Sequence, residues 1–348
     1  MKTDTENEGN IEATGTARLE ESGTASPGAV SPSEGSPSSS SSCGIPGAFA
    51  GTLSGACLDL DAIWLSDARP GLFARVVRPE HPWAALVMVH GSMVHSEYYL
   101  PIALALAGHG IGVVLPDLRG HGRSEGRRGH ADRTLDHISD AIRVLGRTCA
   151  LFPDLPIAVG GESYGALIAY LAAADHPHDA PIAALILSAP AFVLRTQPEP
   201  HLLAWLRRMA RLVPGAYLPV RLTLAGVSSR PDVETLSERD PLINHQYTLG
   251  FYIGLLEAQG RARRVAKRTA IPPTLALLGG RDRVTDNRET EKLLANLPHA
   301  CSIVYPNDLH GVLAEAPART AADIAAFLGA VVSPRGSSTI RDRVTEAP

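Results

Sequence analysis

The sequence has few cysteines and no long apolar run, and both absences narrow the classes of protein that it can encode. Its four cysteines lie far apart and form no CxxC pair or Cys/His cluster, so neither a zinc site nor a dense disulfide framework is indicated. No segment approaches about eighteen consecutive apolar residues, and the first residues are acidic and polar rather than signal-like. We therefore expect a soluble protein of a reducing compartment, the cytoplasm.

Basic residues are not concentrated anywhere in the chain. The 32 lysines and arginines against 36 acidic residues give a net charge of −4, and no block of positive charge dominates any stretch. Binding to the phosphate backbone of a nucleic acid therefore has no electrostatic support, and we expect no nucleic-acid partner.

Composition divides the chain into a folded unit and two tails. Residues 1–53 are rich in Ser, Gly, Pro, Glu and Thr and offer few apolar groups to offset the entropy of ordering, which predicts a disordered N-terminal tail. Residues 333–348 repeat this composition and are predicted to form a disordered C-terminal tail. The folded domain is expected at 54–332.

Inside those limits, short apolar runs alternate with longer segments of helical period. This alternation is typical of βαβ units, and it predicts an α/β fold with a mostly parallel sheet and helices on both faces. The predicted strands are 72–77, 84–89, 112–115, 157–160, 183–187, 274–278 and 302–305. The predicted helices are 98–108, 134–152, 163–175, 287–297 and 317–328.

The stretch at about 191–269 breaks the alternation and is interpreted as an inserted helical cap. In its first part Leu202, Leu206 and Met209 recur near helical spacing, while Arg207 and Arg211 fall on other sides, which indicates an amphipathic basic helix. The favoured interpretation is an apolar face packed on the core. The alternative is a lid that contacts lipid in transient encounters with a membrane or lipid surface.

The segment Gly-Glu-Ser-Tyr-Gly at 161–165 is the sharpest motif of the chain. It follows a predicted strand directly and opens a predicted helix. In that context a serine is held in a strained turn with its hydroxyl exposed, and the flanking glycines remove side chains that would collide there. Ser163 is therefore the candidate nucleophile.

A serine hydroxyl needs a base within hydrogen-bond reach, and the base needs an acid to orient it. His310 is the candidate base because it lies in a loop after the last predicted strand, whereas His299 precedes that strand. Asp282 is the candidate acid, since it lies just beyond another strand end. Asp286 is placed for capping a helix, and Asp308 lies too near the histidine in sequence to orient it easily.

Two backbone amides are candidates for stabilising the oxyanion of an acyl-transfer intermediate. The amide of Ser92 follows the predicted strand 84–89, and the amide of Tyr164 opens the helix after the nucleophile. His90 is expected to hold its loop rather than to move protons. The run at 117–124 contains glycines but lacks the spacing and ending of a phosphate loop, so it is expected to form a tight loop that buttresses the site.

Taken together, these motifs resemble the α/β-hydrolase superfamily, and within it the monoacylglycerol lipase and lysophospholipase group of serine aminopeptidase S33-type hydrolases. The motifs that resemble it are His90-Gly91, His95-Ser96 with Tyr99, Asp117-Leu118-Arg119-Gly120-His121-Gly122-Arg123-Ser124, the serine turn, Leu187-Ser188-Ala189-Pro190, Asp240-Pro241-Leu242, Gly280-Arg281-Asp282-Arg283-Val284 and the loop with His310. The resemblance implies an α/β-hydrolase fold and hydrolysis of a fatty acyl ester through an acyl-enzyme on Ser163, without cofactor or metal.

Several alternatives stay open at this point. The same fold supports general carboxylesterases, peptidases and acyltransferases, and a non-catalytic scaffold that binds a ligand belongs to another class altogether. Val94 stands where such lipases often have a glutamate, so the head group of the small-molecule acyl ester is left open. Acyl length and oligomeric state are open as well.

Overall fold

The computed structural model describes residues 58–131, 134–176, 182–267 and 270–333. The tail predicted at 1–53 lies outside these ranges, and so does the tail predicted at 333–348 apart from Ser333. Within the described ranges, no helix combines the length and the apolar character needed to cross a membrane.

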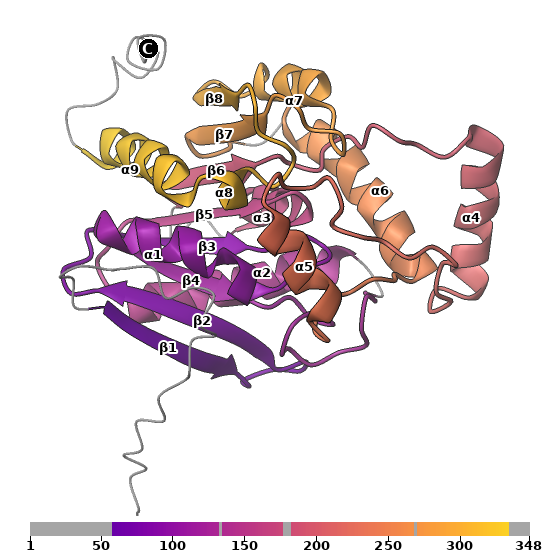
Figure 1. Ribbon diagram of the computed structural model, residues 1–348, viewed down its shortest axis with the longest axis horizontal. Helices are drawn as coiled ribbons and strands as arrows, with labels where there is room; N and C mark the ends of the chain where they lie inside the picture. Colours follow the sequence, from indigo (N-terminus) through magenta and orange to yellow (C-terminus); the bar gives the residue numbers. More distant parts are fainter. Residues whose placement is uncertain (1–57, 132–133, 177–181, 268–269, 334–348) are drawn as a thin grey trace, which may run out of the picture. The chain divides into compact units, whose positions relative to one another are not determined.

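In the described part of the chain, eight strands form one sheet in the order β1-β2-β4-β3-β5-β6-β7-β8 (Figure 1). The strands are β1 (Leu58–Leu65), β2 (Leu72–Pro79), β3 (Ala84–Val89), β4 (Ile111–Pro116), β5 (Ile157–Glu162), β6 (Ala184–Ser188), β7 (Thr274–Gly279) and β8 (Ala300–Tyr305). Neighbours from β4 to β8 are parallel, whereas β2 is antiparallel to both of its neighbours. The predicted α/β class with a mostly parallel sheet is confirmed.

The central strands are continuous apolar runs, and the structure explains why. Every residue of β3, β4 and β5 is buried, because layers of helices cover both faces of the sheet. The edge strand β1 is different, since leucine and aspartate alternate over its first four residues. The predicted strands do not include this one.

The helices lie in two layers. They are α1 (Leu100–Gly108) with the preceding 3₁₀ turn η1 (Ser96–Tyr99), α2 (Thr134–Leu151), α3 (Tyr164–Asp175), α7 (Asn287–Leu294), α8 (Val312–Glu315) and α9 (Pro317–Val332). Helix α1 packs against α9 over one face of the sheet, and α2 packs against α3 over the other (Figure 1). The predicted coverage of both faces is therefore confirmed.

Three further helices are inserted between β6 and β7. They are α4 (Pro200–Leu212), α5 (Pro231–Arg239) and α6 (Leu249–Val265). Helix α6 packs against α2, α3 and α4, whereas α4 has no buried residue and lies at the outer side of α6 (Figure 1). The favoured interpretation of α4, an apolar face packed on the core, is therefore not what the structure has.

The parallel strands bring the predicted site residues to one edge of the sheet. The loops after β3, β5, β6, β7 and β8 all start at carboxyl ends, which lie at the same edge when strands are parallel. Ser92, Ser163, Asp282 and His310 each lie in one of these loops.

Candidate active site

Ser163 lies alone between the end of β5 and the start of α3, in a sharp turn. Its φ of 56° and ψ of −116° are strained for a residue with a side chain. The turn is fixed by its backbone, since Ser163 N donates to Ser188 O at 2.9 Å and Ser163 O accepts from Ala191 N at 3.0 Å. A Cβ at Gly165 would lie 2.1 Å from Val89 O, so only glycine allows this close approach of α3 to β3. The Ser163 side chain is partly exposed.

Asp282 and His310 are in direct contact. His310 Nδ1 lies 2.8 Å from Asp282 Oδ2, and both residues are only 5% exposed. The aspartate also accepts hydrogen bonds from the amides of Val284 and Thr285 and from the Thr285 hydroxyl. Burial alone would raise the pKa of Asp282, but the hydrogen bonds from His310 and Thr285 outweigh it and lower the pKa. The carboxylate is therefore ionised and fixed in orientation.

The loops that contain these two residues pack backbone to backbone. Arg281 N donates to Asp308 O at 2.9 Å. A Cβ at Gly279 would lie 2.0 Å from Leu309 O, so a side chain there would push the two loops apart. The glycine at the end of β7 therefore determines how closely the acid approaches the histidine.

The histidine loop is also tied to the serine turn. Glu162, which directly precedes the nucleophile, accepts a hydrogen bond from Leu313 N at 3.1 Å, three residues after the histidine. Burial raises the pKa of Glu162, and the nearby His310 acts in the opposite direction. Within the described residues, no hydrogen bond joins the Ser163 hydroxyl to His310. The contact between base and nucleophile therefore stays a prediction.

The rival acids and the rival histidine have other surroundings. Asp286 caps α7 by accepting from Arg288 N at 2.9 Å, as its position in the sequence suggested. Asp308 pairs with Arg319. His299 is exposed and precedes β8.

The loop after β3 is held from two sides. The Tyr247 hydroxyl donates to Ser92 O, and Asn244 N donates to Met93 O at 3.0 Å. On the other side, Gly91 N donates to the Tyr99 hydroxyl at 3.0 Å. The segment that contains the Ser92 amide is therefore preorganised before any ligand binds.

Tyr164, whose amide is the second candidate donor, is anchored through its side chain. Its hydroxyl lies 2.7 Å from His137 Nδ1, and its ring packs on Phe251 of α6 with 5.0 Å between centroids. His137 Nε2 lies 3.3 Å from the Arg119 carbonyl, which can only accept, so Nδ1 accepts the tyrosine proton. Burial lowers the pKa of His137, which keeps this acceptor neutral.

His90 holds the neighbouring loop, as expected. Its Nε2 accepts from Leu118 N at 2.9 Å, and its ring is fully buried. Asp117 accepts from Ser96 N at 2.7 Å and from Arg123 N at 2.8 Å, so the run at 117–124 is tied to the segment after β3. The expectation of a tight buttressing loop is confirmed.

Glu162, Tyr99 and Tyr247 organise the loops near the site, but none of them was assigned a role from the sequence. Tyr99 entered only through the family resemblance, and no motif pointed to Tyr247. Glu162 lies inside the serine motif, at a position where the motif allows any residue. Among the described residues, no group of three or more His, Cys, Asp or Glu side chains could hold a metal ion.

Comparisons with known proteins give relatives that are named as lipases and lysophospholipases. The chain is 31% identical over 206 residues to a monoacylglycerol lipase of Mycolicibacterium smegmatis, covering 58% of this chain and 71% of the relative. It is 28% identical over 262 residues to a probable lysophospholipase L2 of Haemophilus influenzae, covering 70% and 82%.

A solved structure and a family model extend the comparison. A soluble variant of a Saccharomyces cerevisiae monoglyceride lipase, in complex with a substrate analog, shares the fold with a TM-score of 0.70 at 16% identity, covering 82% of this chain and 99% of the other. The family model described as serine aminopeptidase, S33, matches residues 80–317, which is more than half of the chain. The chain thus belongs to the serine aminopeptidase S33 family and has the α/β-hydrolase fold.

Proposed function

We propose that this protein is a serine ester hydrolase that cleaves carboxylic esters of fatty acids, as a monoacylglycerol lipase or lysophospholipase does. The observation that supports this most is the strained Ser163 at the carboxyl edge of a sheet whose neighbouring loops hold a buried pair, His310 and Asp282, at 2.8 Å. The names of the relatives support the substrate class.

In the proposed mechanism His310 takes the proton of Ser163 while the hydroxyl attacks the ester carbonyl. Asp282 holds the imidazole in the tautomer that leaves Nε2 able to accept, because the Nδ1–H donates to its carboxylate. The amides of Ser92 and Tyr164 stabilise the oxyanion. Protonated His310 then donates its proton to the leaving alcohol as the acyl-enzyme forms. In the second half, His310 takes a proton from water, which attacks the acyl-enzyme and releases the acid.

The test is hydrolysis of a short nitrophenyl ester and of a monoacylglycerol by Ser163→Ala. We expect loss of both activities with an unchanged melting temperature. Ser139→Ala is the matched control, since this exposed serine of α2 only bonds the carbonyl one turn earlier. A Ser163→Ala enzyme with wild-type activity would contradict the proposal.

The alternatives within the fold differ in acceptor and substrate. A general carboxylesterase prefers short acyl chains, a peptidase cleaves amides, and an acyltransferase uses an alcohol in place of water. Hydrolysis rates on esters of graded chain length test for a general carboxylesterase, and cleavage of a peptide amide tests for a peptidase. Transfer of the acyl group to added glycerol tests for an acyltransferase. A non-catalytic scaffold hydrolyses none of them.

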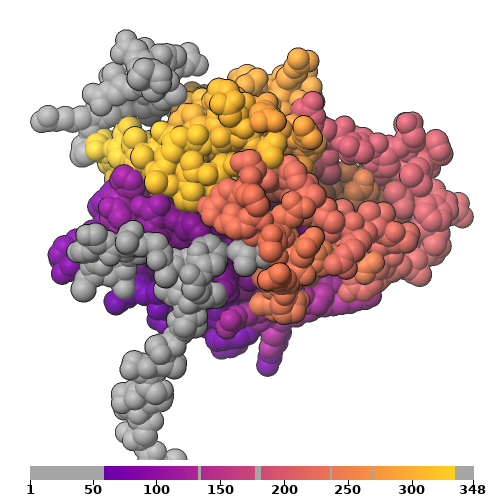
Figure 2. All heavy atoms as spheres, viewed as in Figure 1, coloured from indigo at the N-terminus to yellow at the C-terminus, as the bar shows by residue number. Residues whose placement is uncertain are grey.

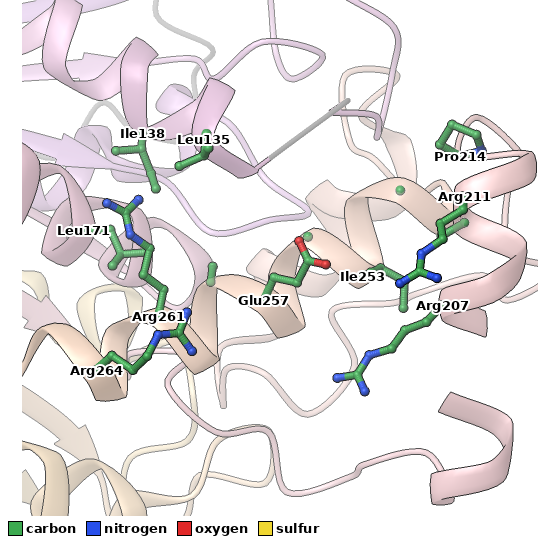
Figure 3. A pocket seen from close by; sticks show the side chains of 14 residues that line it. Leu135, Ile138, Leu171, Arg207, Arg211, Pro214, Ile253, Glu257, Arg261 and Arg264 are labelled. Atoms are coloured by element: carbon green, nitrogen blue, oxygen red, sulfur yellow. The ribbon is translucent and has the colours of Figure 1, made fainter. Parts of the chain in front are cut away.

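We also propose that residues 191–269 form a cap that contacts lipid surfaces. Helix α4 and the loop after it expose large apolar side chains, which are Leu202, Trp205, Leu212, Val213, Tyr217, Val220 and Leu222. Arginines of the same helix, Arg207 and Arg211, line a cavity of about 390 Å³ opposite Arg261 and Arg264 of α6 (Figure 3). Figure 2 shows α4 at the outer surface. Exposed apolar and basic groups on one helix favour an anionic bilayer surface.

A cytoplasmic location is the last part of the proposal. Cys149 and Cys301 are free thiols, which is the state that a reducing compartment maintains. Expression of the full chain with a fluorescent fusion checks this location directly.

A further inference from the structure

Glu162 is a buried carboxylate next to the candidate nucleophile, and the mechanism above gives it no step. It is 7% exposed and is the last residue of β5. Three groups donate hydrogen bonds to it, which are the Tyr99 hydroxyl at 3.0 Å, the Ser188 hydroxyl at 3.0 Å and Leu313 N at 3.1 Å. The three donors leave both carboxyl oxygens hydrogen-bonded.

One oxygen of Glu162 is connected to the segment with the Ser92 amide. Gly91 N–H can only donate, and it donates to the Tyr99 oxygen at 3.0 Å. The tyrosine proton is thus free to point at Glu162 Oε2. Burial raises the pKa of Tyr99 well above its usual range, so the tyrosine keeps this proton. The chain from Gly91 through Tyr99 to Glu162 therefore fixes the segment after β3 against the serine turn.

The other oxygen of Glu162 is connected to the histidine loop. Oε1 accepts from Leu313 N, in the first turn of α8 and three residues after His310, and from Ser188 at the end of β6. A single carboxylate therefore joins the ends of β5 and β6, the loop after β3 and the loop after β8. These are the loops that must keep a fixed geometry during acyl transfer.

Burial raises the pKa of Glu162, and the hydrogen bonds from Leu313, Ser188 and Tyr99 act in the opposite direction. Burying a carboxyl group is unfavourable unless other groups compensate, so a purely structural position would be filled more stably by an apolar side chain.

We propose that Glu162 is a positioning residue that holds the oxyanion segment and the histidine loop at the nucleophile during acyl transfer. This inference rests on the serine hydrolase function proposed above. Asp282 contacts the imidazole itself, through His310 Nδ1. Glu162 instead acts on the loop that contains His310, through Leu313 N.

The test is Glu162→Gln, which keeps the shape of the side chain and replaces one accepting oxygen with a donating amide group. We expect kcat to fall about 10- to 100-fold with KM changed less than about threefold, since the loss is in the geometry of the transition state.

Two further variants accompany this test. Tyr99→Phe removes both the hydrogen bond from Gly91 N and the one to Glu162, so it breaks the connection to the oxyanion segment and kcat should fall. Glu289→Gln on α7 makes the same substitution at a pair with Lys292 on the surface and should leave kcat and KM unchanged.

The proposal is overturned if Glu162→Gln keeps the wild-type kcat, or if its KM rises as much as its kcat falls. Should Glu162→Gln fail to unfold cooperatively, Tyr99→Phe decides, and a wild-type kcat in that variant overturns the proposal. Ser163→Ala in the same assay distinguishes a failure of the proposed function from a failure of the positioning role. If it stays active, the proposed function fails, whereas an inactive Ser163→Ala beside an unaffected Glu162→Gln rejects the positioning role alone.

Discussion

His310 Nδ1 lies 2.8 Å from Asp282 Oδ2, although the two residues come from loops after different strands, β8 and β7. The strands are parallel neighbours, so their carboxyl ends present these loops side by side. The aspartate accepts from two amides and a hydroxyl besides the imidazole, which fixes its orientation. The pair is thus built by backbone packing, and its disruption has specific consequences.

Asp282→Asn should lower kcat by about 10³- to 10⁴-fold with little change in KM, because the amide stabilises the wrong imidazole tautomer and no longer favours the imidazolium. Steady-state kinetics on a nitrophenyl ester measure this loss. Asp286→Asn is the matched control, since asparagine caps a helix as well as aspartate does. Equal activities of the two variants would argue that another residue orients the histidine.

Gly279→Ala should destabilise the protein by about 1–3 kcal/mol, because the added Cβ would lie 2.0 Å from the carbonyl oxygen of Leu309. Urea unfolding measures the free energy of unfolding. Gly146→Ala in α2 meets no atom within 4 Å and should instead stabilise by about 0.5–1 kcal/mol. A Gly279→Ala protein as stable as the wild type would show that the two loops can separate freely.

The buried histidines predict a pH dependence of stability. Burial lowers the pKa of His90 and of His121 to about 3, from 6.5 for a free side chain. Between about pH 6.5 and 3 the two histidines therefore bind protons in the unfolded chain but not in the folded chain. The stability that the neutral histidines allow is complete above about pH 6.5 and is lost as the pH falls toward 3. Each histidine lowers the free energy of unfolding by up to about 1.4 kcal/mol per pH unit in that window.

His121→Gln isolates this effect. The variant should be less stable than the wild type at pH 7.5, and the difference should shrink as the pH falls from 6.5 to 5, because the variant has lost one group that must stay neutral. Urea unfolding of both proteins at matched pH values measures the difference in their free energies of unfolding. The contributions of the other titrating groups are the same in both proteins and cancel in this difference. A difference that is constant with pH would show that His121 is not held neutral by its surroundings.

Trp205→Ala should weaken binding to vesicles of phosphatidylglycerol and phosphatidylcholine by about fivefold to tenfold, the effect of removing one large apolar contact. The side chain is 56% exposed on α4. Trp64→Ala is a close control, because this tryptophan is 55% exposed but lies on β1, away from the cap residues. Cosedimentation measures binding, and equal effects of the two variants would remove α4 as the lipid-contacting element.

The sequence predicted the elements with the strongest patterns and missed those with weak or interrupted ones. Strand β3 was predicted at 84–89 and lies there, because a short continuous apolar run flanked by turn residues is typical of a buried strand. Strand β1 was missed because it adjoins the Ser-rich tail and contains two aspartates on its exposed side. Helix α4 has the periodicity of a packed helix, and only tertiary structure could show that none of its residues is buried.

The site was predictable where chemistry depends on chain order and not where it depends on packing. The order of serine, aspartate and histidine, each in a loop after a strand, selected Asp282 and His310, and the structure brings these two into contact. No pattern indicated that Glu162 would accept a hydrogen bond from Leu313, 151 residues further along the chain, because that contact exists only once β5 and the loop after β8 are adjacent.

The most direct test of the central claim is labelling of the intact protein by a fluorophosphonate, followed by mass spectrometry of its peptides. A serine hydroxyl reacts with such a reagent only when a neighbouring base removes its proton. We predict a single adduct, on the peptide that contains Ser163, and no adduct in His310→Ala at equal reagent and time. An unlabelled wild-type protein, or equal labelling of the two proteins, would contradict the proposed acyl-enzyme mechanism.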